Sequence, residues 1–214
     1  MAKKPIPDPI KHLSKDKTLK KLIGKVKLTK RHKHNNLFIG LLKAIVSQQL
    51  SVKAADTIWN RFLSLFKSQE PTAVNILKLS DDQLRAVGLS YQKAGYIKNI
   101  ATFSLEYTLD YKKLRAKTND ELIDYLIQIK GVGRWTVEML LMFTLDRADI
   151  FPKDDLGIQN SIRALYGLRS EKKAFLADME RITEAWRPHR TLACLYLWQY
   201  KDAESPRQKK TLSK

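Results

Sequence analysis

The chain has 214 residues, 43% of them hydrophobic, so it can bury a core as one domain or two small lobes, which excludes a disordered chain. Its 40 lysines and arginines outnumber 22 acidic residues, and the net charge of +18 points to an anionic partner. Nucleic acid is the favoured partner. A membrane surface fits less well, because no basic stretch carries a large aromatic face, and a merely basic soluble protein is the remaining alternative.

The only cysteine, Cys194, lies within an apolar run. One thiol excludes an internal disulfide, a multi-cysteine zinc site and an iron–sulfur cluster, so we expect a buried small hydrophobic residue. Prolines and lysines, rather than an apolar core, follow the start at residues 1–4, and no segment is apolar enough to span a membrane. We therefore expect a protein that is not secreted: cytoplasmic and nucleoid-associated in a prokaryote, nuclear in a eukaryote.

Residues 1–34 hold twelve lysines and arginines and two aspartates, over half of the net charge. Prolines at positions 5, 7 and 9 keep the start extended, and spaced leucines and isoleucines then predict weak helices that dock on the rest of the protein. Two interpretations stay open. The segment is either an arm that follows DNA phosphates or a solvated flank.

Two apolar helices come next, the first predicted over Leu37–Ser47 after an Asn-Asn cap and the second over Val52–Phe66. Between them stand Gln48, Gln49, Leu50 and the capping Ser51. Adjacent glutamines between apolar helices are unusual. They form either a plain surface turn or a projection of polar side chains into a nucleic-acid groove or a gap in the base stack.

Shorter helices follow, one from Pro71 to Leu77 and one opened by a capping box at residues 80–83 and ended by Gly88. The next helix, Tyr91–Leu105, is amphipathic. We expect its Lys93 and Lys98 to face outward as part of an exposed basic rim.

A second capping box, at residues 118–121, opens a helix predicted over Glu121–Gln128. Gly131 and Gly133 then make a tight turn where positive φ is cheap, and a helix follows over Arg134–Leu145. Such a hairpin leaves backbone N–H groups unpaired where the helix dipole is positive, which suits one phosphate. The alternative is an ordinary helical hairpin with glycines for the turn.

A loop over residues 149–157 leads to three further helices, predicted over Ile158–Leu165, Glu171–Trp186 and Arg190–Tyr200. Residues 201–214 form a basic, polar tail that we expect to be mobile. No run alternates with period two. The sequence therefore predicts an all-α protein of about ten short helices.

Three motifs, at residues 46–51 (VSQQLS), 131–136 (GVGRWT) and 152–158 (PKDDLGI), stand in this order. Together they resemble the helix–hairpin–helix DNA glycosylases, and specifically 3-methyladenine DNA glycosylase II in a compact form without the N-terminal β domain. The resemblance covers residues 35–200 and implies two helical lobes with an active-site cleft between them and the hairpin at residues 119–145. Residues 1–34 would form a basic arm with helices, and 201–214 a basic tail.

The resemblance implies a monofunctional, monomeric enzyme that flips alkylated purines out of duplex DNA and hydrolyses the N-glycosidic bond, starting base excision repair. 3-Methyladenine is the expected base and 7-methylguanine a further candidate. Relatives that also cut the strand carry a lysine where this chain has Trp135, so no lyase activity is expected. A non-catalytic helix–hairpin–helix DNA-binding protein is the alternative.

Asp155 is the catalytic residue that the resemblance implies, with Asp154 as its rival, because an apolar helix residue, Ile158, follows Asp155 at the family's spacing. Asp155 also stands at a helix N-cap position. Trp135 and Trp198 take the positions of the family's pocket tryptophans, with the core as the alternative, and Met139 and Leu156 replace pocket tyrosines.

The resemblance places a wedge in the duplex at Gln49 or Leu50, with DNA contacts from Gln48 and Ser51. The residues implied for a phosphate at the hairpin are Gly131, Val132, Gly133, Arg134 and Thr136. The carbonyls implied for a structural monovalent cation, sodium or potassium, are those of Ile127, Ile129 and Val132. No other cofactor is expected.

Overall fold

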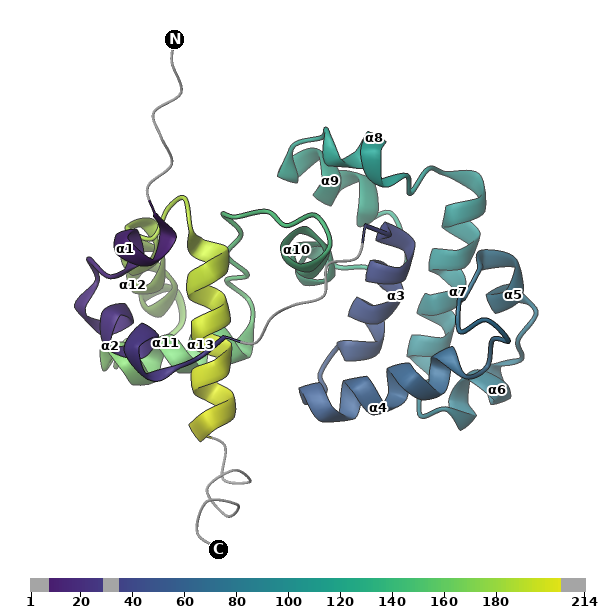
Figure 1. Cartoon of the computed structure of the whole chain (residues 1–214), viewed down its shortest axis with the longest axis horizontal. Coiled ribbons are helices and arrows are strands. Elements are labelled where there is room, and N and C mark those ends of the chain that lie inside the picture. The colour runs from purple at the N-terminus through teal and green to yellow at the C-terminus, as the bar shows by residue number, and fades with distance from the viewer. Residues whose placement is uncertain (1–7, 29–34, 205–214) are drawn as a thin grey trace, which may run out of the picture. The chain divides into compact units, whose positions relative to one another are not determined.

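The computed structural model describes residues 8–28 and 35–204, and every regular element in this part of the chain is a helix (Figure 1). The expected all-α class is confirmed. None of the described helices has the length and apolarity needed to cross a bilayer. The expected extended start, the end of the basic arm and most of the basic tail fall on residues 1–7, 29–34 and 205–214, outside the described residues.

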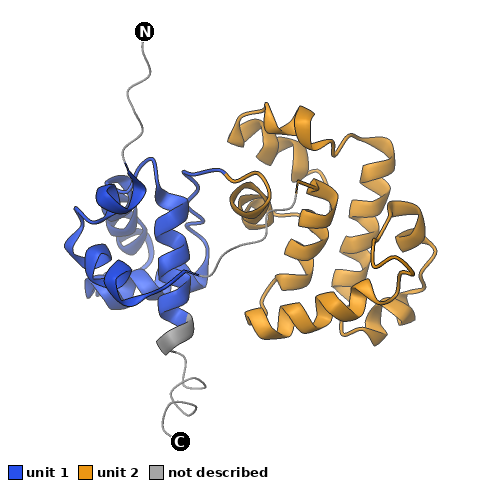
Figure 2. Cartoon of the chain, in the orientation of Figure 1, with its two compact units in different colours: residues 1–32, 147–214 blue, residues 33–146 orange. Residues whose placement is uncertain are grey.

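The chain forms two compact units (Figure 2). Unit 1 comprises Met1–His32 and Arg147–Lys214, and unit 2 comprises Lys33–Asp146. The N-terminal helices therefore belong to the same unit as the C-terminal helices, in line with the expectation that helices within residues 1–34 dock on the rest of the protein.

Unit 2 contains the helices α3 (Leu37–Ser47), α4 (Val52–Leu63), α5 (Ala73–Leu77), α6 (Asp81–Ala86), α7 (Tyr91–Glu106), α8 (Tyr111–Arg115), α9 (Asn119–Leu126) and α10 (Arg134–Phe143). The apolar α3 packs against α4, α7 and α10, and its Leu41, Leu42 and Ile45 are fully buried. A Cβ at Gly40 would overlap Leu140 and Thr144, so glycine lets α3 approach α10 closely.

The predicted caps are confirmed. The side chains of Asn36, Ser51, Ser80 and Thr118 each accept a backbone N–H of the helix that they begin. Helix α4 ends three residues earlier than predicted, because the Ser64 hydroxyl donates to the Arg61 carbonyl at 2.7 Å in a terminal turn. Helix α8 was not predicted, since five residues are too few to show a period.

Unit 1 contains α1 (Pro9–Leu13), α2 (Lys17–Lys25), α11 (Leu156–Tyr166), α12 (Lys172–Glu184) and α13 (Arg190–Glu204). Helices α2 and α11 pack against α13, over a core that includes Leu19, Ile158 and Trp186. Helix α13 continues to Glu204, beyond the predicted end at Tyr200, so the first residues assigned to the tail are helical.

Asp16 links the N-terminal helices to this core. Its Oδ1 caps α2 by accepting the amides of Thr18 and Leu19 at 2.8 and 3.0 Å. Its Oδ2 accepts the Tyr166 hydroxyl at 2.7 Å and the Trp186 indole N–H at 3.2 Å. Burial and the Asp16 carboxylate raise the pKa of the Tyr166 hydroxyl, so Tyr166 remains a donor at physiological pH.

Asp16→Ala should lower the free energy of unfolding by about 3 kcal/mol, because it removes a helix cap and leaves two partly buried donors without their acceptor. Urea denaturation measures the change. The matched control is Asp8→Ala, which removes only the cap of α1 and should lower it by about 1 kcal/mol or less. Equal effects would show that the bonds to Tyr166 and Trp186 contribute nothing.

Candidate functional site

Asp155 caps helix α11, as the sequence predicted. Its Oδ1 accepts the Ile158 amide at 2.8 Å and the Trp198 indole N–H at 3.0 Å. Two donors from different helices fix the orientation of the carboxylate, which remains partly exposed. The rival Asp154 is exposed. A fixed, accessible carboxylate is the arrangement that acid–base or electrostatic catalysis requires.

Two side chains beside Asp155 extend this site. Leu156, the first residue of α11, is 71% exposed, an unusual position for a large apolar side chain at a helix start. Lys201 of α13 was missed, because its position was assigned to the mobile tail. A Cβ at Gly157 would lie 3.0 Å from Asp155 Oδ1 and 3.1 Å from Lys201 Nζ, so the carboxylate and the amine both border this glycine. Continuing the helical period from Trp198 to residue 201 would have found it.

The loop before Asp155 is fastened to the start of α13. Arg190 binds Asp149 with two bonds, Nε to Oδ1 at 2.6 Å and Nη2 to Oδ2 at 3.0 Å. The Thr191 hydroxyl donates to the Arg147 carbonyl at 2.6 Å and accepts the Ile150 amide at 3.0 Å. Together with Trp198, these bonds hold the 147–155 segment at two places on α13, its first turn and residue 198, which limits the movement of the carboxylate.

Trp198 is partly exposed and its indole N–H donates to Asp155, so this side chain is not buried in the core.

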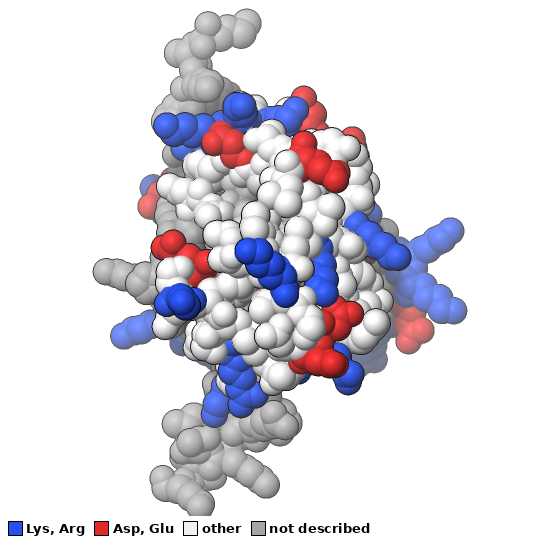
Figure 3. All heavy atoms as spheres, turned by 90° about the vertical axis from the view of Figure 1, so that its right-hand side faces the viewer, with Lys and Arg blue, Asp and Glu red and all other residues white. Residues whose placement is uncertain are grey.

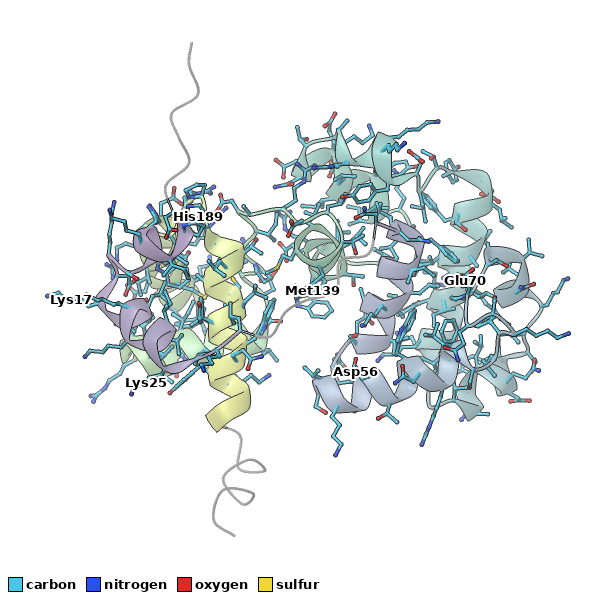
Figure 4. The ribbon with its side chains drawn as sticks, in the orientation of Figure 1. Lys17, Lys25, Asp56, Glu70, Met139 and His189 are labelled. Carbon is cyan, nitrogen blue, oxygen red and sulfur yellow. The ribbon has the colours of Figure 1, made fainter. Side chains whose placement is uncertain are left out.

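Cys194 is fully buried, as expected. His189 lies at the start of α13 (Figure 4), where its ring packs edge-on against that of His12 with centroids 5.4 Å apart. Among the described residues, no group of three or more His, Cys, Asp or Glu side chains is arranged to hold a metal ion.

In unit 2, residues 48–51 form a turn between α3 and α4, called the glutamine turn below. Gln48 turns inward, and its Nε2 donates to Thr136 Oγ1 of α10 at 3.0 Å. Gln49 is exposed and has φ of +56°, and Leu50 is 39% exposed. Of the two glutamines, only Gln49 is presented outward, next to the exposed edge of Leu50.

The hairpin between α9 and α10 is supported by α7. Gly131 has φ of +98°, and a Cβ there would overlap the Tyr96 ring. Asn99 Nδ2 donates to the Lys130 carbonyl at 3.0 Å. Gly133 has φ of −93°, so the expectation of positive φ is confirmed for Gly131 and wrong for Gly133, which is instead the N-cap of α10.

Gly133 has no side chain to cap α10, so the helix begins without a side-chain hydrogen bond. The peptide groups implied for the phosphate, Gly131 to Arg134, surround this start. The Arg134 side chain is exposed and pairs with buried Glu138 at 3.3 Å. Thr136 is buried and its hydroxyl accepts Gln48, so any contact of Thr136 with a phosphate would come from its backbone.

The carbonyls of Ile127, Ile129 and Val132 all belong to this turn. The Ile129 carbonyl accepts the Val132 amide at 2.9 Å and keeps one lone pair for a ligand. Because a carbonyl can accept twice, the turn is compatible with the implied monovalent cation, which stays a prediction.

The resemblance implies four pocket residues, and each is described here within its own unit. Helix α10 supplies partly exposed Trp135 and Met139, which is 8% exposed and is labelled on that helix in Figure 4. Unit 1 supplies Trp198 and Leu156.

On the face shown in Figure 3, lysine and arginine side chains are interspersed with acidic and uncharged ones, so the excess positive charge is not gathered into one patch there.

The sequence of this chain is similar to those of DNA repair proteins. The family described as "HhH-GPD superfamily base excision DNA repair protein" matches residues 42–188. The chain is 39% identical to DNA-3-methyladenine glycosylase 1 of Schizosaccharomyces pombe, over 86% of this chain and 80% of that protein. It is 35% identical to the alkylbase DNA glycosidase-like protein mag2 of the same yeast, over 88% and 91%.

The fold is similar to the solved structure of the S. pombe 3-methyladenine DNA glycosylase Mag1 in complex with abasic DNA. The TM-score is 0.81 at 36% identity, with 91% of this chain and 96% of that chain covered. The match spans both units, since it covers most of the chain.

Proposed function

The chain belongs to the HhH-GPD superfamily of base excision DNA repair proteins, and from this premise we propose that it is a monofunctional DNA glycosylase for alkylated purines in duplex DNA. The proposed reaction is hydrolysis of the N-glycosidic bond of 3-methyladenine, with 7-methylguanine as a further candidate. One observation carries the proposal: the carboxylate of Asp155 is held by two donors and remains accessible.

The chemistry follows from the charge of the substrate. In DNA, 3-methyladenine and 7-methylguanine are cationic and leave as neutral molecules, so neither needs a general acid. Its departure produces an oxocarbenium-like sugar, which an adjacent carboxylate stabilises, and the same carboxylate can orient the attacking water. The proposed chemistry therefore uses Asp155 and water and calls for no redox or metal cofactor.

The remaining residues would deliver the base to this carboxylate. Because the target lies inside a duplex, it must be flipped out, and Gln49 is the exposed side chain proposed to fill the gap. The uncapped start of α10 would hold one phosphate of the same strand. Trp135 and Trp198 would select a cationic base by stacking and cation–π attraction, worth about 0.5–2 kcal/mol per ring.

Incubating methylated duplex DNA with the purified protein tests the proposal, with strand breaks read on a gel before and after treatment with an abasic-site endonuclease and compared with DNA incubated without the protein. We expect the excess of breaks to appear only after the endonuclease, because hydrolysis leaves an abasic site in an intact strand. An excess of breaks before the endonuclease would indicate a lyase, and no excess after it would indicate a protein that binds DNA without catalysis.

Trp198→Phe should lower the single-turnover rate of base release about 10-fold, since it keeps a ring but removes a charge-assisted hydrogen bond worth about 1.5 kcal/mol. The dissociation constant for DNA should change less than about twofold. The control is Trp186→Phe, which removes an indole bond to Asp16 in the same unit and should lower stability without slowing release. If both variants slowed release equally, Trp198 would act only through stability.

A further inference from the structure

Lys93 of α7 differs from its expected outward position. It is half-buried, and its Nζ donates to the carbonyls of Val46 and Gln48, both at 2.8 Å. Gln48 is the C-cap of α3 and the first residue of the glutamine turn. One ammonium group thus joins the last carbonyls of α3, where the helix dipole is negative, to the turn that presents Gln49.

The glutamine turn is strained. Gln49 has φ of +56°, a left-handed conformation that residues with a Cβ adopt uncommonly. Such strain persists only where surrounding contacts hold it, and it concentrates at functional sites. Here two contacts hold Gln48, the residue directly before Gln49: the Lys93 bond to its carbonyl and the bond from its side chain to Thr136.

Stability alone gives a poor reason for a lysine here. Burial lowers the pKa of the Lys93 amine, because loss of hydration disfavours its charged form. Because the folded pKa lies below the unfolded one, the charge opposes folding at neutral pH, and stability should rise with pH between the two values. A glycine or a water molecule could satisfy the end of α3 without this penalty.

The same helix also supports the hairpin. Tyr96 fills the space left by the missing Cβ of Gly131, and Asn99 binds the Lys130 carbonyl. Lys93, Tyr96 and Asn99 follow one another at three-residue spacing on α7, so they share a face. On this face Lys93 contacts the glutamine turn, and Tyr96 and Asn99 contact the hairpin turn.

We propose that Lys93 is a positioning residue that fixes the glutamine turn, so that Gln49 enters the base stack in register with the phosphate held at the hairpin. The proposal rests on the proposed function. It assigns Lys93 no contact with the reacting atoms: the residue acts through Gln49.

The test measures how well the full chain distinguishes a duplex containing tetrahydrofuran, a stable abasic analogue, from the same duplex undamaged. The wedge matters only where a base is missing from the stack, whereas phosphate contacts are the same in both duplexes. Lys93→Met should reduce this affinity ratio about 10-fold and leave binding of the undamaged duplex within about twofold. Its Tm should stay within about 3 °C of the wild-type value.

Four variants complete the design. Lys93→Arg keeps the charge and the donors and should retain most of the ratio. Lys98→Met is the matched control, because Lys98 lies on the same helix and pairs with Asp81 instead; it should leave the ratio unchanged. Gln49→Ala should reduce the affinity ratio as much as Lys93→Met does. The double variant should reduce it no further than Gln49→Ala, because both changes remove the same contribution of Gln49.

Additive losses in the double variant, an unchanged ratio in Lys93→Met, or a fall in Tm without a fall in the ratio would each overturn the proposal. A loss of affinity for both duplexes alike, with a weaker salt dependence, would make Lys93 a phosphate contact instead. The binding ratio requires no turnover, so its failure is distinguishable from failure of base release, which tests the proposed function.

Discussion

Asp155→Asn is expected to slow the release of methylated bases by about 10²–10⁴-fold while leaving DNA binding within about twofold of the wild-type value. The reason is the loss of negative charge beneath the sugar. Phosphate contacts, which dominate affinity, are untouched.

This substitution should remove the charge of residue 155 and keep its hydrogen bonds. Asparagine caps helices as well as aspartate does, and its amide oxygen can accept the Ile158 amide and the Trp198 indole N–H that Asp155 accepts. The fold and the orientation of the group should therefore survive. Asp154→Asn is the control, since Asp154 is the exposed neighbour, and it should retain at least about half of the activity. If the two variants exchanged these results, Asp154 would be the catalytic residue.

Gly131→Ala is expected to lower the free energy of unfolding by about 2–4 kcal/mol and to weaken DNA binding. The added Cβ would have to occupy a left-handed conformation and would overlap the Tyr96 ring. Pushing Tyr96 away would displace the face of α7 that supports the hairpin, so the phosphate site would be distorted along with the core.

Gly133→Ala is the matched control for stability. Gly133 has φ of −93°, and a Cβ there would meet nothing within 4 Å. Denaturant titration should therefore show a loss of about 1 kcal/mol or less, from the poorer helix cap. The double variant Gly131→Ala/Tyr96→Ala removes the overlap with the Tyr96 ring, but the alanine must still adopt the left-handed conformation of residue 131. Similar stabilities of the two single glycine variants would show that the hairpin tolerates a side chain at residue 131.

The parts of the fold that could be predicted are those written in neighbouring residues. Thr118 and Glu121, three positions apart, specify the start of α9 through a local exchange of hydrogen bonds. Asn36 and Ser51 do the same for α3 and α4. Helix α8 and the early end of α4 escaped prediction, because both depend on one or two local bonds rather than on a sustained period.

The candidate site, too, could be predicted only where it depends on neighbouring residues. The N-cap position of Asp155 is local and was predicted, whereas its bond to Trp198 joins residues 43 positions apart. Lys93 was assigned to an outward face because helical period alone cannot reveal the α3 carbonyls that lie 45 and 47 residues away. Lys201 was missed because α13 continues where composition suggested a tail. Long-range packing, which no single motif encodes, decides these three contacts.

The central claim is that this chain breaks the bond between an alkylated purine and its sugar, using the carboxylate of Asp155. Chromatographic identification of the bases freed from methylated duplex DNA tests it most directly, with the wild-type protein and Asp155→Asn compared at equal DNA occupancy. The account predicts free 3-methyladenine from the wild-type protein and almost none from the variant. Absence of free base from folded, DNA-bound wild-type protein, or equal release by Asp155→Asn, would contradict it.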